Sequence, residues 1–334
     1  MASGKVNGRV RWVDVLKGVL ILLVVFGHAV QGLAADAMLA ENPQIQGIHF
    51  ARDMVYSFHM PAFFVVSGFF AGGLWQKDLH AQVRSRLHRL VKPYFVWGFL
   101  TACAMQLMSR FTNNGEGLVD FLRSPVVPFS QFWYLYVLFF LFLLHCGLSV
   151  ALRQYADSVL LGLSVVLYVV QPVVPDVWIL RDFCGYALYY AVGMYVFLPL
   201  NVLAGGTGKV APPAPHKNEA AALLGMQGGA TLLYGRCQSF LIATVGFSVA
   251  YGASVLLSRT HGVVARALEW FGTESLAIYV THLLAVQGLR IVFVRFLHMS
   301  DLWLVALVAT ALGTALCWAF IVLAKRTGLY RYLF

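Results

Sequence analysis

The chain has 334 residues, of which 60% are hydrophobic and only 11% are charged. An ordinary water-soluble domain carries about 25% charged residues, so this composition excludes a soluble globular protein and predicts a polytopic integral membrane protein. The net charge of +10 does not indicate a nucleic-acid partner, because lysine and arginine gather in the cytoplasmic loops of membrane proteins and no nucleic-acid-binding motif is present.

The first apolar run, WVDVLKGVLILLVVFGHAVQGLAA at residues 12–35, is long enough to cross a bilayer and is expected to remain as an anchor. It holds Asp14, Lys17 and His28, and such groups are costly in a membrane unless they are paired or face a polar cavity. Lys17 and His28 project from nearly the same helix face, about 16 Å apart along the axis, and Asp14 can pair with Lys17. We therefore expect both to line one polar tunnel. The alternatives are a Lys17 that reaches the membrane interface and a His28 that only bonds a neighbouring helix.

The rest of the chain supplies eight further apolar runs of spanning length and one short, Gly-rich run at 219–235. The eight runs cover 54–75, 93–109, 132–150, 157–174, 183–203, 238–257, 274–297 and 301–324. Basic residues precede the first span and follow the last, which puts both termini in the cytoplasm and requires an even number of spans. The expected fold class is therefore all-α, a polytopic membrane helix bundle of about ten transmembrane helices. We expect one integral-membrane domain over 1–334, with a cytoplasmic Gly/Pro linker at 204–218.

Polar residues recur in the second run and in the basic segment behind it. His59 and Pro61 break the regularity of the second run, and Ser67 stands next to a glycine where another helix or a ligand can approach. The following RSRLHRLVKPYF carries Arg86 and Arg89 at i, i+3, with Lys92 nearby, on a short helix expected to end before Pro93. Guanidinium groups bind phosphate in a bidentate fashion, so this cluster favours a nucleotide or pyrophosphate. Anionic lipid headgroups are the competing partner.

Taken together, five segments in this order resemble acyltransferase family 3, whose members O-acetylate or otherwise O-acylate cell-surface and exported carbohydrates. The segments are WVDVLKGVLILLVVFGH with Lys17 and His28, SFHMPAFFVVSGFF, RSRLHRLVKPY with Arg86 and Arg89, QFWYLYVLFF at 131–140, and WFGTESLAIYVTHLL at 270–284 with Tyr279 and His282. The resemblance implies an acyl-CoA donor, most often acetyl-CoA, and a sugar hydroxyl of a cell-surface, exported or lipid-linked glycan as acceptor. It implies that His28 is the essential histidine and that Arg86 and Arg89 bind the CoA phosphates.

The resemblance also implies that the protein is surrounded by membrane lipids. We expect it to lie in the bacterial inner membrane. Some family members carry an additional C-terminal esterase-like domain. This chain ends shortly after its last span, so we expect the stand-alone form. Its five cysteines form no CxxC pair, so no metal site is predicted.

The expected chemistry is a direct transfer in which His28 takes the proton of the sugar hydroxyl. Lys17, Ser67 or backbone N–H groups are candidates to stabilise the oxyanion, and Lys92 is expected to assist the arginine pair. Asp14, His59, Ser67, Tyr279 and His282 are expected to support the substrate or the site. An acyl-histidine intermediate stays open, and the carboxylate that orients His28 is left among Asp53, Asp182 and Glu274. The alternatives are a transporter that uses buried lysine and histidine, and an acyltransferase with a succinyl or longer donor.

Overall fold

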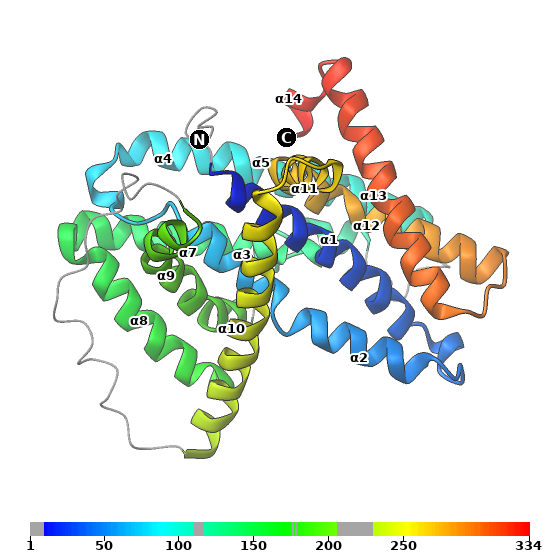
Figure 1. Ribbon diagram of the computed structural model, residues 1–334, viewed down its shortest axis with the longest axis horizontal. Coiled ribbons are helices and arrows are strands. Elements are labelled where there is room, and N and C mark those ends of the chain that lie inside the picture. Colours follow the sequence, from blue (N-terminus) through cyan, green and yellow to red (C-terminus); the bar gives the residue numbers. More distant parts are fainter. Residues whose placement is uncertain (1–9, 110–116, 176, 178, 206–229) are drawn as a thin grey trace.

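A computed structural model describes residues 10–109, 117–175, 177, 179–205 and 230–334. These residues form helices and, within those ranges, no strand. Long apolar runs can satisfy their backbone N–H and C=O groups in lipid only as helices or closed barrels. The all-α prediction is therefore confirmed. The start of α1 and the short α14 lie on the same side of the bundle (Figure 1).

The α-helices are α1 Arg11–Ala34, α2 Ile45–Tyr56, α3 His59–Gly68, α4 Leu79–Arg86, α5 Lys92–Leu107, α6 Leu118–Leu122, α7 Trp133–Leu152, α8 Ala156–Val170, α9 Leu180–Leu203, α10 Ala230–Ser258, α11 Val263–Thr273, α12 Ser275–Ile291, α13 Leu302–Arg326 and α14 Tyr330–Leu333. Short 3₁₀ turns link several of them, and π-helical segments occupy η3 Leu87–Val91 and η8 Val292–Phe296.

Each of the nine longer predicted runs is largely helical, but the count of ten spans is not confirmed. Among the described residues, six helical stretches are long and apolar enough to cross a membrane, and the chain is an integral membrane protein. One of the six, Ser130–Val173, holds two helices, α7 and α8, which separate where Arg153 takes a positive φ of 50°. The second and third predicted runs do not form a helix long enough to cross a membrane. The second run is divided between the separate helices α2 and α3, and the third forms α5, which has only 16 residues.

The short run at 219–235 and the linker at 204–218 fall mostly on residues that the structure does not describe, 206–229. Residues 230–235 belong to α10, which continues without a break through the run at 238–257. The described part of 219–235 therefore does not form a span of its own.

Helix α1 occupies the centre of the bundle and contacts α2, α3, α10, α11, α12 and α13 (Figure 1). Glycines allow the closest of these contacts. A Cβ atom on Gly272, at the end of α11, would lie 1.6 Å from the Asp14 carbonyl oxygen, and one on Gly18 would lie 2.0 Å from that of Leu268. The start of α12 is thereby fixed beside the first turns of α1.

Helices α1 and α12 run side by side in the same direction. At one end α11, which leads directly into α12, packs on the first turns of α1. At the other end Arg290, near the end of α12, binds Asp36, which follows α1. The first halves of the two helices therefore face one end of the bundle and their second halves face the other.

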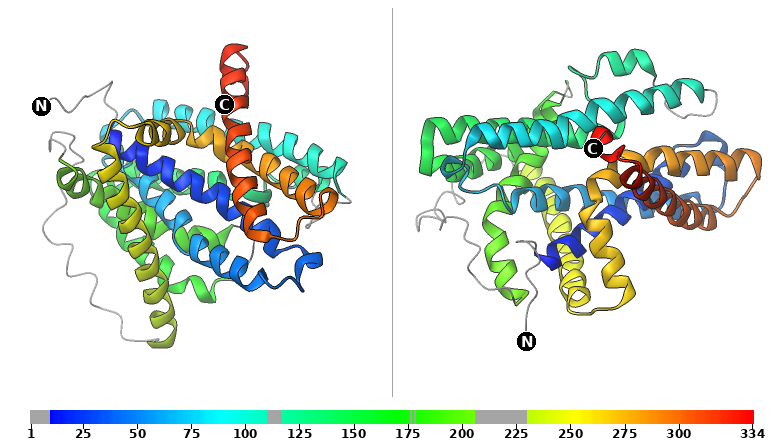
Figure 2. Two further views of the ribbon diagram at one scale, coloured as in Figure 1. Left: turned by 45° about the vertical axis from the view of Figure 1, so that its right-hand side comes forward. Right: turned by 90° about the horizontal axis from the view of Figure 1, so that it is seen from above.

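The basic segment behind α3 differs from the prediction of a short helix that ends before Pro93. Helix α4, the π-helical η3 and α5 continue into one another over residues 79–107, as the long helical stretch in Figure 2 shows. Pro93 stands in the first turn of α5, where its missing N–H does not break the helix because the wider π turn precedes it. Arg89 lies within this π segment, and π bulges are frequent at functional sites.

Candidate functional site

Two cavities lie at the two ends of α1 and α12. Val13 and Lys17 of α1 line the first, together with Ser275 and Tyr279 of α12. The later turns of both helices line the second, which His28 borders. We call the first the basic cavity and the second the histidine cavity. Their volumes are about 340 Å³ and about 650 Å³, within or near the range of about 300–1,000 Å³ typical of small-molecule sites.

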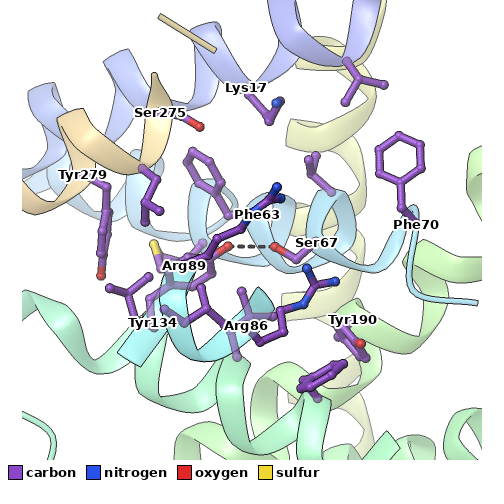
Figure 3. A pocket seen from close by; sticks show the side chains of 18 residues that line it. Lys17, Phe63, Ser67, Phe70, Arg86, Arg89, Tyr134, Tyr190, Ser275 and Tyr279 are labelled. Atoms are coloured by element: carbon purple, nitrogen blue, oxygen red, sulfur yellow. Dashed lines mark hydrogen bonds between the residues drawn. The ribbon is translucent and has the colours of Figure 1, made fainter. Parts of the chain in front are cut away.

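The basic cavity is lined by residues from six α-helices, from the π-helical η3 and from the loop that holds Phe70. Its polar lining residues are Lys17, Ser67, Arg86, Arg89, Tyr134, Tyr190, Ser275 and Tyr279. Figure 3 shows Lys17 on one side of the cavity and Arg86 on the opposite side. The Ser67 hydroxyl is hydrogen-bonded to the Tyr134 hydroxyl, with 2.8 Å between the oxygens, so Ser67 is anchored at the wall.

The cationic groups of this cavity differ in how they are neutralised. The Lys17 ammonium lies 2.6 Å from the Asp14 carboxylate, as the i, i+3 spacing predicts. The Arg86 guanidinium lies over the Phe142 ring, 5.2 Å from its centroid. Neither Arg86 nor Arg89 forms an ion pair or a hydrogen bond with any residue that the structure describes. Two guanidinium groups without a carboxylate partner make this cavity suited to an anion.

A loop after α3 borders the basic cavity through Phe70. The Lys77 ammonium donates to the Phe70 carbonyl at 2.9 Å, and burial lowers the pKa of Lys77. The Asp157 carboxylate accepts from the Gly73 backbone N–H at 2.7 Å and contacts the His145 Nε2 at 2.8 Å. Sequence reasoning did not single out Asp157 or His145, because their importance depends on a loop more than 70 residues away. Only the folded structure brings Asp157 into contact with that loop.

The histidine cavity is lined by several amide side chains, and the arginines that line it each bind a carboxylate. Its polar lining residues are His28, Gln31, Arg52, Asp53, Tyr56, Thr101, Ser130, Gln131, Gln287 and Arg290. Gln287 donates to the His28 backbone carbonyl at 2.9 Å and accepts from Arg290 at 2.8 Å. Arg290 in turn binds the Asp36 carboxylate at 2.6 Å. This buried series of contacts fixes α12 against the turn of α1 that carries His28.

The predicted single tunnel past Lys17 and His28 is divided in the structure. Tyr279, a lining residue of the basic cavity, donates its hydroxyl to the Gln131 backbone carbonyl, and Gln131 lines the histidine cavity. One turn later on α12, the fully buried His282 lies 5.9 Å from the Tyr279 ring and 4.9 Å from the His28 ring, centroid to centroid. We call Tyr279 and His282 the dividing wall. Helical periodicity places Lys17 and His28 on one face but does not reveal side chains that another helix inserts between them.

His282 has a defined hydrogen-bonding pattern. Its Nδ1 lies 2.7 Å from the Tyr279 carbonyl oxygen, so Nδ1 carries the proton and donates it. The Nε2 atom is then an acceptor, and it has no hydrogen-bond partner among the described residues. His59 lies at the start of α3, 1% exposed, with Nδ1 2.6 Å from the Val55 carbonyl and its ring 4.8 Å from Tyr56.

The remaining predicted residues lie away from His28 or from the cavities. The Lys92 ammonium donates to the Arg331 carbonyl at 2.5 Å, and Lys92 does not line the basic cavity. Glu274 binds Lys325 at 2.6 Å. The structure therefore does not bring Lys92 to the arginine pair or Glu274 to His28.

Of the other carboxylates considered as partners of His28, Asp53 shares the histidine cavity but binds Arg52 at 2.8 Å. Asp182 lies in the first turn of α9 and lines neither cavity. The ring that faces His28 most closely is that of His282, followed by Tyr56 at 6.1 Å. Sequence reasoning named His282 as support but had no means to pair it with His28.

The family model of the acyltransferase domain matches residues 10–322. The chain belongs to the acyltransferase 3 family. It is similar to Nodulation protein NolL of Sinorhizobium fredii (strain NBRC 101917 / NGR234), with 31% identity over 144 residues that cover 42% of this chain and 37% of the relative.

Nodulation protein NolL of Mesorhizobium japonicum (strain LMG 29417 / CECT 9101 / MAFF 303099) is 30% identical over 146 residues, which cover 41% of this chain and 35% of the relative. The chain thus spans little more than a third of the length of these curated relatives. No solved structure matches the chain significantly. The chain is therefore an integral membrane protein of the acyltransferase 3 family.

Proposed function

We propose that the protein transfers an acetyl or other acyl group from acyl-CoA to a sugar hydroxyl of a cell-surface or exported glycan. The observation that carries the proposal is the position of His28 at the wall between two cavities. One cavity holds two arginines that have no ion pair among the described residues, and the other is lined by several amides. The phosphates of CoA suit the basic cavity, because Arg86 and Arg89 have no carboxylate partner among the described residues. The acceptor suits the histidine cavity, where His28 can meet a hydroxyl group.

In the proposed reaction, a nitrogen of His28 takes the proton of the sugar hydroxyl while the hydroxyl oxygen attacks the thioester carbonyl carbon. The carbon–sulfur bond then breaks, and the CoA thiolate leaves and takes up the proton. The products are the sugar ester and CoA with a free thiol. Lys17 and Ser67 line the donor side and are candidates to bind the pantetheine or the carbonyl oxygen. For the thioester to reach His28, side chains of the dividing wall must move aside.

The same proposal gives an orientation. Basic residues of α4 and η3 border the basic cavity, and such residues favour the cytoplasmic side of a membrane. We therefore assign the basic cavity to the cytoplasmic face of the bacterial inner membrane, with both termini on that face. The histidine cavity then opens toward the other half of the bilayer.

The purified protein in nanodiscs should release CoA from an acyl-CoA only when an acceptor glycan is present, and mass spectrometry should find the acyl group on the glycan. A series of acetyl-, succinyl- and longer acyl-CoA donors will identify the acyl group. If no donor gives CoA release and acylated glycan together, the proposed function is wrong.

A further inference from the structure

We propose that the histidine cavity binds an uncharged sugar ring and excludes acidic ones, with Gln131 as the residue that recognises the ring hydroxyls. This inference rests on the proposed function in assigning the acceptor to that cavity. The reaction alone does not require a neutral acceptor, because glycans that carry carboxylates or phosphates also offer hydroxyl groups.

Each arginine that lines the histidine cavity binds a carboxylate, Arg52 that of Asp53 and Arg290 that of Asp36. Arg52 binds Asp53 through both Nε and Nη2, each 2.8 Å from the same carboxylate oxygen. Arg290, only 2% exposed, binds Gln287 and Asp36, and the Asp36 carboxylate also binds Arg295. An acidic sugar in this cavity would lose its hydration without gaining an unpaired cation, and a desolvated charge that lacks a partner is costly.

The basic cavity has the opposite character, because Arg86 and Arg89 have no carboxylate partner within the described chain. The two cavities therefore separate the substrates by charge. An anionic donor is attracted to one cavity, and the second cavity does not compete for its phosphates. A neutral acceptor completes this separation, whereas an acidic acceptor would be drawn to the arginines on the wrong side of the wall.

Gln131 is the buried amide of this cavity that has no partner among the described residues, whereas Gln31 is partly exposed. Gln287 already uses its nitrogen on the His28 carbonyl and its oxygen on Arg290. Gln131 lines the cavity and is 5% exposed, and neither its Nε2 nor its Oε1 has a partner among the described residues. A buried amide without a partner destabilises a fold, and a ligand that offers both a donor and an acceptor removes this penalty. Adjacent sugar hydroxyls offer this combination.

The surroundings of Gln131 fit a recognition role beside the reacting group. Its backbone carbonyl accepts the Tyr279 hydroxyl at the dividing wall, and its neighbour Trp133 lines the same cavity with a large aromatic surface on which a sugar ring can stack. The preceding Ser130 has a positive φ of 47°, a conformation that is unfavourable for a non-glycine residue. Gln131 thus contacts Tyr279 of the dividing wall directly, and the Tyr279 ring in turn lies beside that of His282, which faces His28.

The test measures binding of glycans to the full chain in nanodiscs without any acyl-CoA. The probes are neutral tetrasaccharides of glucose, galactose and mannose, each beside the same tetrasaccharide oxidised to the uronic acid at C6. Saturation-transfer NMR and isothermal calorimetry report binding. At least one neutral tetrasaccharide is expected to bind, and its oxidised counterpart should bind at least about 10-fold more weakly.

The Gln131→Leu variant tests the recognition residue, because it removes an unpartnered buried amide at nearly constant size. It should unfold at the same or a higher temperature than the unaltered protein, while its affinity for the neutral sugar falls about 10-fold. Ser149→Ala is the matched control. Ser149 is 3% exposed, its hydroxyl has no partner among the described residues, and it lines neither cavity. This control should keep its sugar affinity.

Equal or tighter binding of the oxidised sugars, or no binding of any neutral one, would overturn the inference. Unchanged affinity in Gln131→Leu would overturn the role of Gln131. The comparison of neutral and oxidised sugars uses the unaltered protein, so it tests the inference even if Gln131→Leu fails to fold. If a neutral sugar binds with this selectivity but no acyl-CoA acylates it, the proposed function fails and the inference about the cavity stands.

Discussion

The imidazole rings of His28 and His282 lie 4.9 Å apart, centroid to centroid, on two parallel helices that are more than 240 residues apart in the chain. One ring borders the histidine cavity and the other is fully buried in the wall toward the basic cavity. In the proposed reaction, a proton taken from an acceptor hydroxyl on one side must be delivered to a thiolate on the other. A pair of imidazoles at the boundary has the position for this task.

The first prediction concerns His28 as the general base. His28→Gln keeps the size and one hydrogen bond but cannot take up a proton at neutral pH, so acyl transfer should fall by about 10²–10⁴-fold. Expression and binding of acyl-CoA should not change. His80→Gln, at an exposed histidine of α4 that lines neither cavity, is the control and should keep its activity. Near-normal transfer by His28→Gln would make His28 a packing residue.

The second prediction separates the two nitrogens of His282. Asparagine reproduces the Nδ1 donor that binds the Tyr279 carbonyl but has nothing in place of Nε2. His282→Asn should therefore keep the melting temperature of the protein and lower kcat by about 10-fold or more, with little change in KM for acyl-CoA. A purely structural role predicts near-normal kcat in this variant. The pH profile of kcat gives a second readout, because loss of a proton-transfer partner should change its shape and not only its height.

The third prediction concerns the arginine pair. Arg86→Ala or Arg89→Ala should raise the apparent KM for acetyl-CoA by about 10- to 100-fold, since each variant removes a charge-assisted contact to phosphate. Neither variant should change KM for acetyl-pantetheine, which has no phosphate. Arg84→Ala removes an exposed arginine of the same segment that does not line the cavity, and its KM should match that of the unaltered protein. If the effect extended equally to acetyl-pantetheine, the pair would act on the fold or on lipid headgroups instead.

Sequence patterns predicted those features that depend on neighbours in the chain. The Asp14–Lys17 pair follows from i, i+3 spacing, and the break near His59 and Pro61 appears as the start of α3 at His59. Apolar runs of about 20 residues predicted an integral membrane protein because the bilayer imposes that length.

Features that depend on packing between distant helices could not be predicted in this way. The periodicity that aligned Lys17 with His28 is a property of α1 alone, whereas the wall between their cavities comes from α12. Lys92 was grouped with the arginines by proximity in sequence, but its ammonium binds the Arg331 carbonyl near the end of the chain. A polar glutamine beside an aromatic segment, Gln131, was visible in the sequence, but only its burial without a partner distinguishes it.

The last prediction concerns Tyr279 as the barrier between the cavities. Its hydroxyl binds the Gln131 carbonyl across the dividing wall, and its ring lies 5.4 Å from Tyr134 and 5.9 Å from His282. Tyr279→Ala should join the two cavities and let water reach a bound thioester. We expect acetyl-CoA hydrolysis without acceptor to rise roughly 10-fold while transfer to the glycan falls, because a closed site normally suppresses this side reaction.

Tyr279→Phe provides the matched variant, since it keeps the ring in the wall and removes only the hydroxyl. It should show little hydrolysis and should retain most of the transfer activity. The measurement is CoA release with and without glycan, compared with the amount of acylated product from the same reaction. If Tyr279→Ala hydrolyses acetyl-CoA no faster than Tyr279→Phe, the barrier between donor and acceptor lies in other residues, and His282 becomes the next to test.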